Sequence, residues 1–117
     1  MEIRNRAMQK PFTTKDGSTI ISLLDLANAP VKNQSLAEAR LPAGCSTQRH
    51  YHKESEEFYY VLHGSGRMEI DGEVEMISMG DAVLIPASAW HQITAEEELV
   101  FLCCCAPPYR HEDTFFE

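Results

Sequence analysis

The sequence predicts an all-β domain that folds as a sandwich or a barrel. Short runs rich in Ile, Val, Leu, Phe and Tyr alternate with turn-forming residues along most of the chain. No run has the length and period of an amphipathic helix, and residues 24–29 are expected to form one helical turn at most. The 117 residues are too few for two independent cores, so we expect a single domain spanning residues 1–117.

The first strands are expected at residues 19–24 and 35–41. The turn-forming residues 15–18 precede the first strand, and the turn 28–30 separates the two. A third strand, residues 57–62, is rich in aromatic and aliphatic side chains and ends before a Gly-Ser-Gly segment. A short run of this composition that is bounded by turn residues is typical of a strand.

A hairpin is predicted at Asp71-Gly72, which lies between runs 67–70 and 74–78. Asp-Gly favours a two-residue turn because both residues tolerate positive φ. The turn Met79-Gly80-Asp81 introduces the next strand. The last three strands are expected at residues 82–85, 91–94 and 99–105.

The overall composition limits the classes of partner. The net charge is −8 and the sequence pI is about 5.0, which argues against nucleic acid because phosphates require a basic surface. No run of eighteen apolar residues is present, so we expect no membrane span. The first twelve residues lack the apolar core of a signal peptide, and we therefore expect a cytoplasmic protein.

Three of the four cysteines are consecutive, Cys103 to Cys105, and the fourth is Cys45. Neighbours on a strand point to opposite faces and therefore do not easily form disulfides. We interpret them as reduced, buried thiols that pack as small apolar residues in the strand 99–106. A redox or metal-binding role is the less favoured alternative, because no C-x-x-C motif is present.

A cluster of polar residues interrupts this β pattern. His50 and His52 share a face if they lie on a strand, where their Cα atoms are about 6.6 Å apart, so both can bind one ion. Residues 53–56 then let the chain turn, and we expect Glu57 to face back in a hairpin. His91, which follows a second turn-and-strand unit, is the candidate for a fourth ligand.

The spacing of these residues resembles that of a known family. Residues 44–64 read G-x5-H-x-H-x4-E-x6-G, and residues 80–91 read G-x5-P-x-S-x2-H. Both segments resemble the two signature motifs of the cupin superfamily. Ser88 and Ala95 depart from the second motif, in which glycine and asparagine are usual, and this weakens any assignment to a subfamily.

The resemblance implies a double-stranded β-helix, which is a jelly-roll barrel that holds a divalent metal near one mouth. The implied ligands are His50, His52, Glu57 and His91. Three imidazoles and one carboxylate suit Mn, Fe, Ni, Co or Zn. An ion with open coordination positions is typical of catalysis rather than of structure.

Two classes of function fit this ligand set. The first is a metal-dependent enzyme, an isomerase or a dioxygenase, that acts on a small oxygen-rich substrate such as a sugar, uronate, keto acid or enol. The second is a non-catalytic cupin module that binds a small ligand. The intact ligand set favours the enzyme, although a fold does not by itself specify a reaction.

Strand alternation predicts which side chains line the barrel. Gln48 and Ser46 share parity with the histidines, and Tyr59 and Val61 share parity with Glu57. Gln48 is a candidate for orienting a ligand, and Tyr59 is either a hydrogen-bond donor to substrate or a packing residue.

No arginine is placed in the cavity by this alternation, so the sequence offers no dedicated anchor for a phosphate or carboxylate. Arg49 and Arg67 are the arginines nearest to the motifs in the chain.

We also expect a homodimer with a separate metal site in each barrel. A small barrel buries limited apolar surface, and its exposed strand edges need covering. The strands at 19–24 and 35–41 are candidates for extending a partner's sheet, and cupin relatives commonly dimerise in this way.

Overall fold

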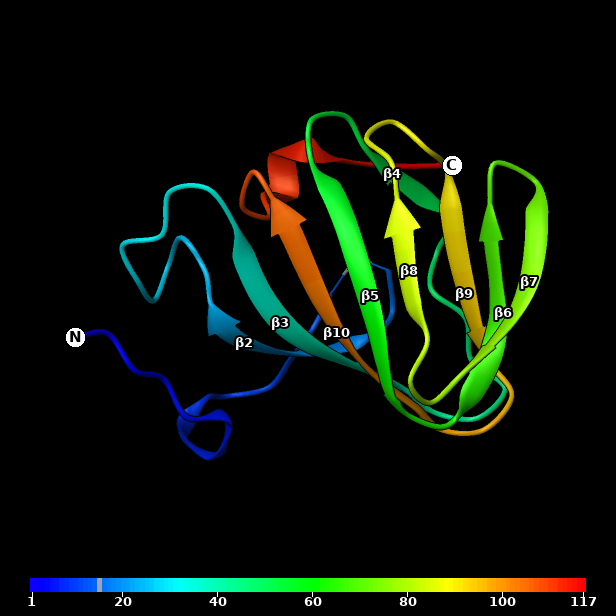
Figure 1. Cartoon of the computed structure of the whole chain (residues 1–117), viewed down its shortest axis with the longest axis horizontal. Coiled ribbons are helices and arrows are strands. Elements are labelled where there is room, and N and C mark those ends of the chain that lie inside the picture. The colour runs from blue at the N-terminus through cyan, green and yellow to red at the C-terminus, as the bar shows by residue number, and fades with distance from the viewer. Residues whose placement is uncertain (15) are drawn as a thin grey trace.

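The computed structural model describes residues 1–14 and 16–117, and it is all-β (Figure 1). Two 3-10 helices occur in these ranges, η1 (Arg6–Met8) and η2 (His111–Asp113). No helix in these ranges is long and apolar enough to cross a membrane. The strands, in chain order, are β1 (Phe12–Thr13), β2 (Thr19–Leu24), β3 (Ser35–Leu41), β4 (His50–His52), β5 (Glu56–His63), β6 (Ser65–Ile70), β7 (Glu73–Ser78), β8 (Ala82–Ile85), β9 (His91–Ala95), β10 (Leu99–Ala106) and β11 (Thr114–Phe116).

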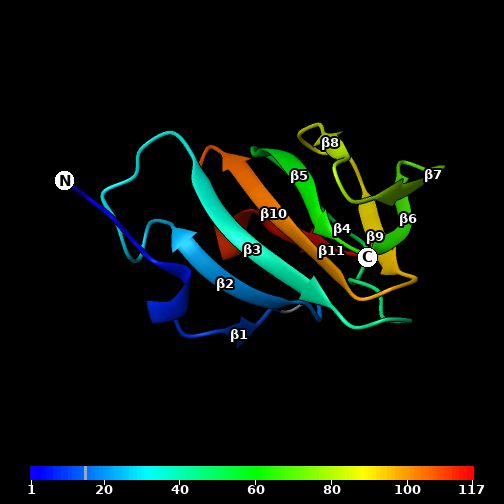
Figure 2. The same cartoon turned by 60° about the horizontal axis from the view of Figure 1, so that its bottom comes forward.

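The strands form two antiparallel sheets that pack face to face as a jelly roll. The six-stranded sheet has the order β1-β2-β3-β10-β5-β8, and the five-stranded sheet has the order β11-β4-β9-β6-β7. Figure 2 shows β1, β2 and β3 at one side of the first sheet, with the second sheet behind it. The predicted all-β barrel is therefore confirmed.

The core lies between the two sheets. Along β5, Tyr59 and Val61 point inward and are buried, whereas Phe58, Tyr60 and Leu62 point outward. The buried side chains that meet them come from both sheets, which ties the layers together through apolar burial. Fully or nearly fully buried core residues include Leu41, Ile85, Ile93, Leu99 and Phe101.

All eight strands expected from the sequence are present, and the structure shortens none of them. Strands β2, β3 and β8 have the predicted bounds, and the others extend by one or two residues. The predicted hairpin is confirmed, because Asp71 and Gly72 both have positive φ, 48° and 88°, in the turn between β6 and β7. Residues 24–29 form a turn in which the Ala29 amide donates to the Asp25 carbonyl at 3.1 Å, but no helix.

Gly64, between β5 and β6, lies where the chain crosses from one sheet to the other. Its φ is +86°, and a Cβ at this position would collide with the backbone carbonyl of Glu98. Gly72 has almost the same φ, +88°, yet a Cβ there would meet nothing within 4 Å. The two glycines therefore share a conformational requirement but differ in steric room.

We expect Gly64→Ala to destabilise the fold by about 3 kcal/mol or more, and Gly72→Ala by only about 1 kcal/mol. Both substitutions place alanine at positive φ, but only the first forces the backbone of Glu98 to move. Urea denaturation of both variants measures the difference. Equal losses of stability would show that the close approach at Gly64 carries no cost.

Candidate metal centre

Strand β4 places two histidines on the inner face of the five-stranded sheet. His50 and His52 are only 3% and 4% exposed, and Tyr51 between them points outward. The Tyr51 ring packs against Trp90 and Phe115, with ring centroids 4.6 and 5.1 Å apart. This aromatic cluster on the outer face holds β4 so that both imidazoles face the interior.

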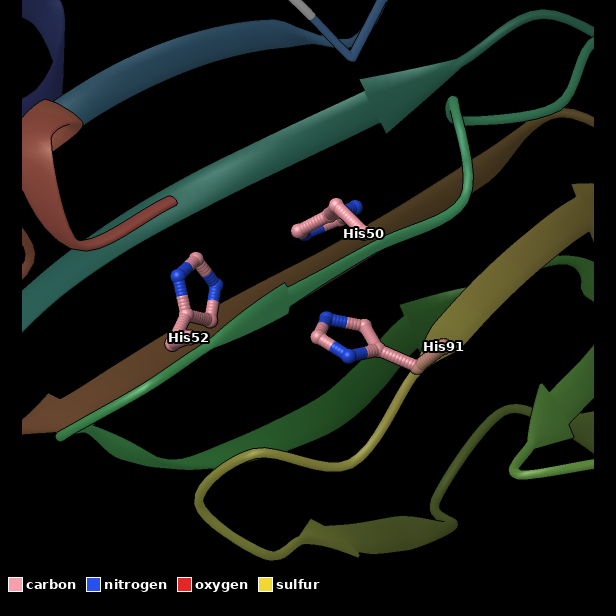
Figure 3. Close-up of side chains that lie close together, drawn as sticks. All are labelled: His50, His52 and His91. Atoms are coloured by element: carbon pink, nitrogen blue, oxygen red, sulfur yellow. The ribbon is translucent and has the colours of Figure 1, made fainter. Parts of the chain in front are cut away.

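The third histidine comes from the neighbouring strand. His91 begins β9, and its Cα is the register partner of His50. Its ring extends from β9 toward the two histidines of β4 (Figure 3) and is 1% exposed. One ring nitrogen from each of His50, His52 and His91 lies within 4.8 Å of the other two, a group that could hold a metal ion.

Glu57 approaches this group from the opposite sheet. Its Oε1 lies 3.3 Å from His52 Nε2 and 3.5 Å from His91 Nε2, and the side chain is buried. The expectation that His52 and Glu57 face each other in a hairpin is wrong, because β4 and β5 belong to different sheets. Residues 53–55 instead carry the chain across the barrel, so the carboxylate faces the imidazoles across the interior.

Each imidazole is held through its Nδ1 atom. His50 Nδ1 lies 2.7 Å from the Gln48 carbonyl, and His91 Nδ1 lies 3.0 Å from the Ala89 carbonyl. A carbonyl only accepts, so in both rings Nδ1 donates its hydrogen, and a neutral ring then carries its lone pair on Nε2.

The third ring follows the same pattern. His52 Nδ1 lies 3.2 Å from Thr114 Oγ1, whose own hydrogen is donated to the Arg110 carbonyl. The Thr114 hydroxyl oxygen can therefore accept the hydrogen of His52 Nδ1. The neutral His52 ring then has the lone pair of Nε2 available for another partner. Such outer partners orient metal-binding histidines and set their tautomer.

The protonation states of the histidines and of Glu57 depend on burial and on the interactions of these side chains with one another. Burial, together with the nearby His91, lowers the pKa of His50 to about 4, so this ring is neutral near pH 7. Burial lowers the pKa of His52 as well, but the nearby Glu57 outweighs that effect and raises the value above 6.5. Burial favours the neutral form of Glu57, yet His52 and His91 hold its pKa well below the usual range.

Two buried polar atoms at the centre have no hydrogen-bond partner among the described residues. They are Glu57 Oε1 and His91 Nε2. Leaving such an atom unpaired costs about 1–3 kcal/mol, so a buried pair of this kind needs an explanation. A cation between them satisfies both, because each presents a lone pair and the donor set of imidazole and carboxylate suits a divalent transition metal.

The two residues predicted to act on a ligand have different surroundings. Tyr59 is buried and lines the cavity beside the histidines. The expectation that Gln48 and Ser46 point inward is wrong, since both are exposed and Thr47 between them is buried. The segment before β4 is not part of the strand, so the alternation does not extend backward from His50. Gln48 contributes its carbonyl oxygen to His50 instead.

The cysteines are unpaired, and those of β10 differ in their surroundings. Cys105 is buried and donates its thiol hydrogen to Glu57 Oε2 at 3.3 Å, and Cys103 lines the same cavity. Burial raises the pKa of both thiols, which keeps them protonated. The expectation of buried thiols in an apolar strand holds in full for Cys105 and in part for Cys103 and Cys104, which are half-buried, whereas Cys45 is exposed.

The C-terminal segment forms part of the site, which the sequence did not predict. Strand β11 pairs with β4, with Thr114 opposite His52 and Phe116 opposite His50. The Phe116 ring lies 5.7 Å from the His50 ring, and the Tyr109 ring lies 5.9 Å from the His52 ring. Thr-Phe-Phe is too short to predict a strand, so no sequence signal identified this contribution.

The surroundings of Ser88 show how a serine is accommodated in the second motif at the position where glycine is usual. Its φ is +67°, a conformation that glycine adopts without cost. Two hydrogen bonds hold it there, from its amide to the His52 carbonyl at 2.6 Å and from its hydroxyl to the Lys53 carbonyl at 3.2 Å. The loop before His91 is thereby attached to the end of β4.

Comparison with known proteins supports the resemblance seen in the sequence. The family model for the cupin domain matches residues 37–105, which include all four residues of the centre. An uncharacterized protein of Methanocaldococcus jannaschii is 46% identical over 107 residues, which are 90% of this chain and 86% of that protein.

Solved structures share the fold at low sequence identity. A predicted oxalate decarboxylase from Thermotoga maritima has a TM-score of 0.79 and 23% identity, over 90% of this chain and 98% of that one. Pac13, described as a nucleoside dehydratase and found in Streptomyces, has a TM-score of 0.82 and 15% identity, over 100% of this chain and 91% of that one. At these identities the likeness establishes the fold alone.

Histidine NMR of the metal-free protein tests the proton positions. We expect His50 to titrate near pH 4 and His52 above pH 6.5, with the His50 hydrogen on Nδ1 at pH 7. Long-range ¹H–¹⁵N spectra report both the titration and the tautomer. In urea, both rings should return to the ordinary pKa of about 6.5. A hydrogen on Nε2 of His50 in the folded protein would contradict the tether to Gln48.

Proposed function

This chain belongs to the cupin domain family, and on that basis we propose that it binds one divalent transition-metal ion through His50, His52, Glu57 and His91. One observation carries the proposal. The three rings are tethered through Nδ1, and buried atoms of Glu57 and His91 remain without a partner at the point where the rings meet. This ligand set suits Mn, Fe(II), Co, Ni and Zn alike.

We further propose a metal-dependent enzyme of the isomerase or dioxygenase type that acts on a small oxygen-rich substrate. When bound, the ion supplies a Lewis acid for a substrate oxygen or, if redox-active, a centre for O2 chemistry. The cavity beside the centre is lined by residues of both sheets and opens to solvent, so a small molecule can approach the ion.

Within this cavity, Tyr59 is the candidate for contact with substrate. Burial raises the pKa of its phenol well above 10, so the group keeps its hydrogen and acts as a donor rather than as a base. Its ring is fixed between Phe101 and His91, with centroids 4.6 and 6.2 Å away. Tyr59 is therefore suited to orient a substrate oxygen beside the ion.

The function is tested by identifying the metal in freshly purified protein and then screening substrates with and without O2. Turnover that consumes O2 supports a dioxygenase, and anaerobic turnover supports an isomerase or lyase. Ligand binding without turnover under either condition supports the alternative, a non-catalytic cupin module.

Metal occupancy is expected to depend on the four proposed ligands acting together. The double variant His50→Ala/His52→Ala should lose nearly all bound metal, and Glu57→Gln or His91→Ala should weaken binding by at least about tenfold. Elemental analysis gives the occupancy, and circular dichroism shows whether the fold survives. We expect survival, because the apolar strands build the barrel.

Cys104→Ser is the control, since Cys104 lies between the cavity-facing Cys103 and Cys105 and does not line the cavity. Its metal content should equal that of the wild type. Stoichiometric metal in the double histidine variant would show that the proposed ligands are wrong.

We also propose a homodimer, formed through the outer apolar face, defined as Phe58, Tyr60 and Leu62 of β5 with Leu84 of β8. These side chains are 40–54% exposed, and Phe58 and Leu84 are register partners. The structure does not favour β3 as an extension of a partner's sheet, because β3 lies between β2 and β10 within its own sheet. A contiguous exposed apolar face of this kind is typical of an interface.

Light scattering coupled to size-exclusion chromatography should give twice the chain mass of 13.2 kDa. Phe58→Glu should shift the protein to monomer, because a carboxylate would be buried against the partner. Met79→Glu, at a 70% exposed turn residue outside the outer apolar face, should leave the mass unchanged. A wild-type monomer at micromolar concentration would refute the dimer.

A further inference from the structure

Apart from the histidines, the described charged side chains that line the cavity beside the proposed centre are all acidic. The cavity runs from the proposed centre toward β2, β3 and the C-terminal segment. Its charged lining residues, apart from the histidines, are Glu57, Asp16 and Asp25, and no described lining residue is Lys or Arg. The three carboxylates outweigh the two positive charges of a divalent ion, so the described lining residues and the ion together carry a net negative charge.

The two aspartates are fixed by neutral partners. Asp16 Oδ1 accepts from the Ser18 amide at 2.9 Å, from the Ser18 hydroxyl at 2.6 Å and from the Thr14 hydroxyl. Asp25 accepts from the Ser22 hydroxyl and from the amides of the turn that follows it. Neither forms an ion pair with a described residue. The Arg4 guanidinium reaches the turn held by Asp25 but donates to the Asn28 carbonyl rather than to the carboxylate.

The arginines nearest to the motifs point away from the cavity. Arg49 pairs with Glu69 at 2.6 Å and lies over the Trp90 ring at 5.2 Å, on the outer side of the sheet. Arg67 is exposed on β6. Among the described lining residues, a carboxylate or phosphate of a substrate would therefore find no Lys or Arg, and the ion would be its cationic partner.

The remaining lining combines rings with hydroxyl groups. Phe12, Phe101 and Phe116 contribute apolar surface, and Tyr109 lies beside the His52 ring. Hydroxyl groups come from Ser22, Ser35 and Thr114, among others. Such walls suit a molecule with an apolar or ring-shaped body and a few neutral oxygen atoms.

From this composition we propose that the cavity accepts a neutral, oxygen-bearing ligand with a ring or hydrocarbon face and discriminates against dianions such as oxalate. The inference rests on the proposed function, because the ion is the common anchor for either kind of ligand. Among the substrate classes compatible with the sequence, it favours neutral sugars and enols over uronates and keto acids. The negative charges of Asp16 and Asp25 disfavour the anionic classes, and no described cation compensates.

Two small chelating probes test this with the metal-loaded protein. Both probes bind metals through two oxygen atoms. Oxalate binds as a dianion, whereas acetohydroxamic acid, which is neutral in water near pH 7, releases one proton to solvent on binding and carries only one negative charge in the site. Isothermal titration calorimetry should show acetohydroxamic acid binding at least about tenfold more tightly than oxalate. Oxalate binding as tightly or more tightly would overturn the inference.

A pair of variants at Ser22 tests the electrostatic cause. Ser22→Lys places a positive charge beside Asp25, and Ser22→Gln is the neutral control of similar length. Oxalate affinity should be about tenfold higher in the lysine variant than in the glutamine variant, with the smaller negative charge of bound acetohydroxamate giving a smaller increase. Equal oxalate affinities would overturn the inference.

The same titrations separate this inference from the proposed function. If the protein retains no metal, or holds a metal that binds neither probe, the proposed function fails and this inference fails with it. If the metal is held and oxalate is preferred, only the inference fails. Lys15→Gln, which changes the residue outside the described ranges, should bind both probes as the wild type does, and a loss of oxalate affinity there would reveal a cationic anchor and overturn the inference.

Discussion

The orientation of the three imidazoles through Nδ1 is the interaction on which the rest of the centre depends. Strand alternation places the Cβ atoms of His50 and His52 on the inner face, but it does not decide which ring nitrogen faces inward. The carbonyls of Gln48 and Ala89 and the hydroxyl of Thr114 make that choice. Each tether occupies Nδ1, so each neutral ring presents the lone pair of Nε2. A single cation that accepts these lone pairs is the simplest way to give all three rings a partner.

The tethers also connect the centre to parts of the chain that are distant in sequence. Thr114 belongs to the C-terminal strand β11, which covers the edge of β4. Asp113, one residue earlier, accepts hydrogen bonds from the Glu54 and Ser55 amides, where the chain leaves β4 for the opposite sheet. The end of the chain thus holds both the His52 ring and the crossing that brings Glu57 across the barrel. The same segment contributes the rings of Tyr109 and Phe116 to the cavity wall.

The sequence predicted the strands well because their signals are local: short apolar runs between turn residues mark β2 and β3, and an Asp-Gly turn marks the hairpin at Asp71-Gly72. Motif spacing correctly brought together His50, His52, Glu57 and His91, because the spacing reflects the path of the chain through the barrel. Prediction from the sequence failed where pairing between distant segments determines the structure. Sequence signals predict a hairpin after β4 and an inward-facing Gln48, and they do not place the C-terminal segment at the metal centre. Two-residue alternation describes one strand and contains no information on which sheet a strand joins.

The central claim is that one divalent ion is bound by nitrogen and oxygen atoms from both sheets and by no thiolate. X-ray absorption spectroscopy of the metal-loaded protein tests it directly, because it distinguishes ligand types around the ion. The account predicts a shell of nitrogen and oxygen at about 2.0–2.2 Å, with the outer scattering of imidazole rings. A sulfur shell at about 2.3 Å would contradict it, since that distance is typical of a cysteine thiolate, and Cys103 and Cys105 line the same cavity.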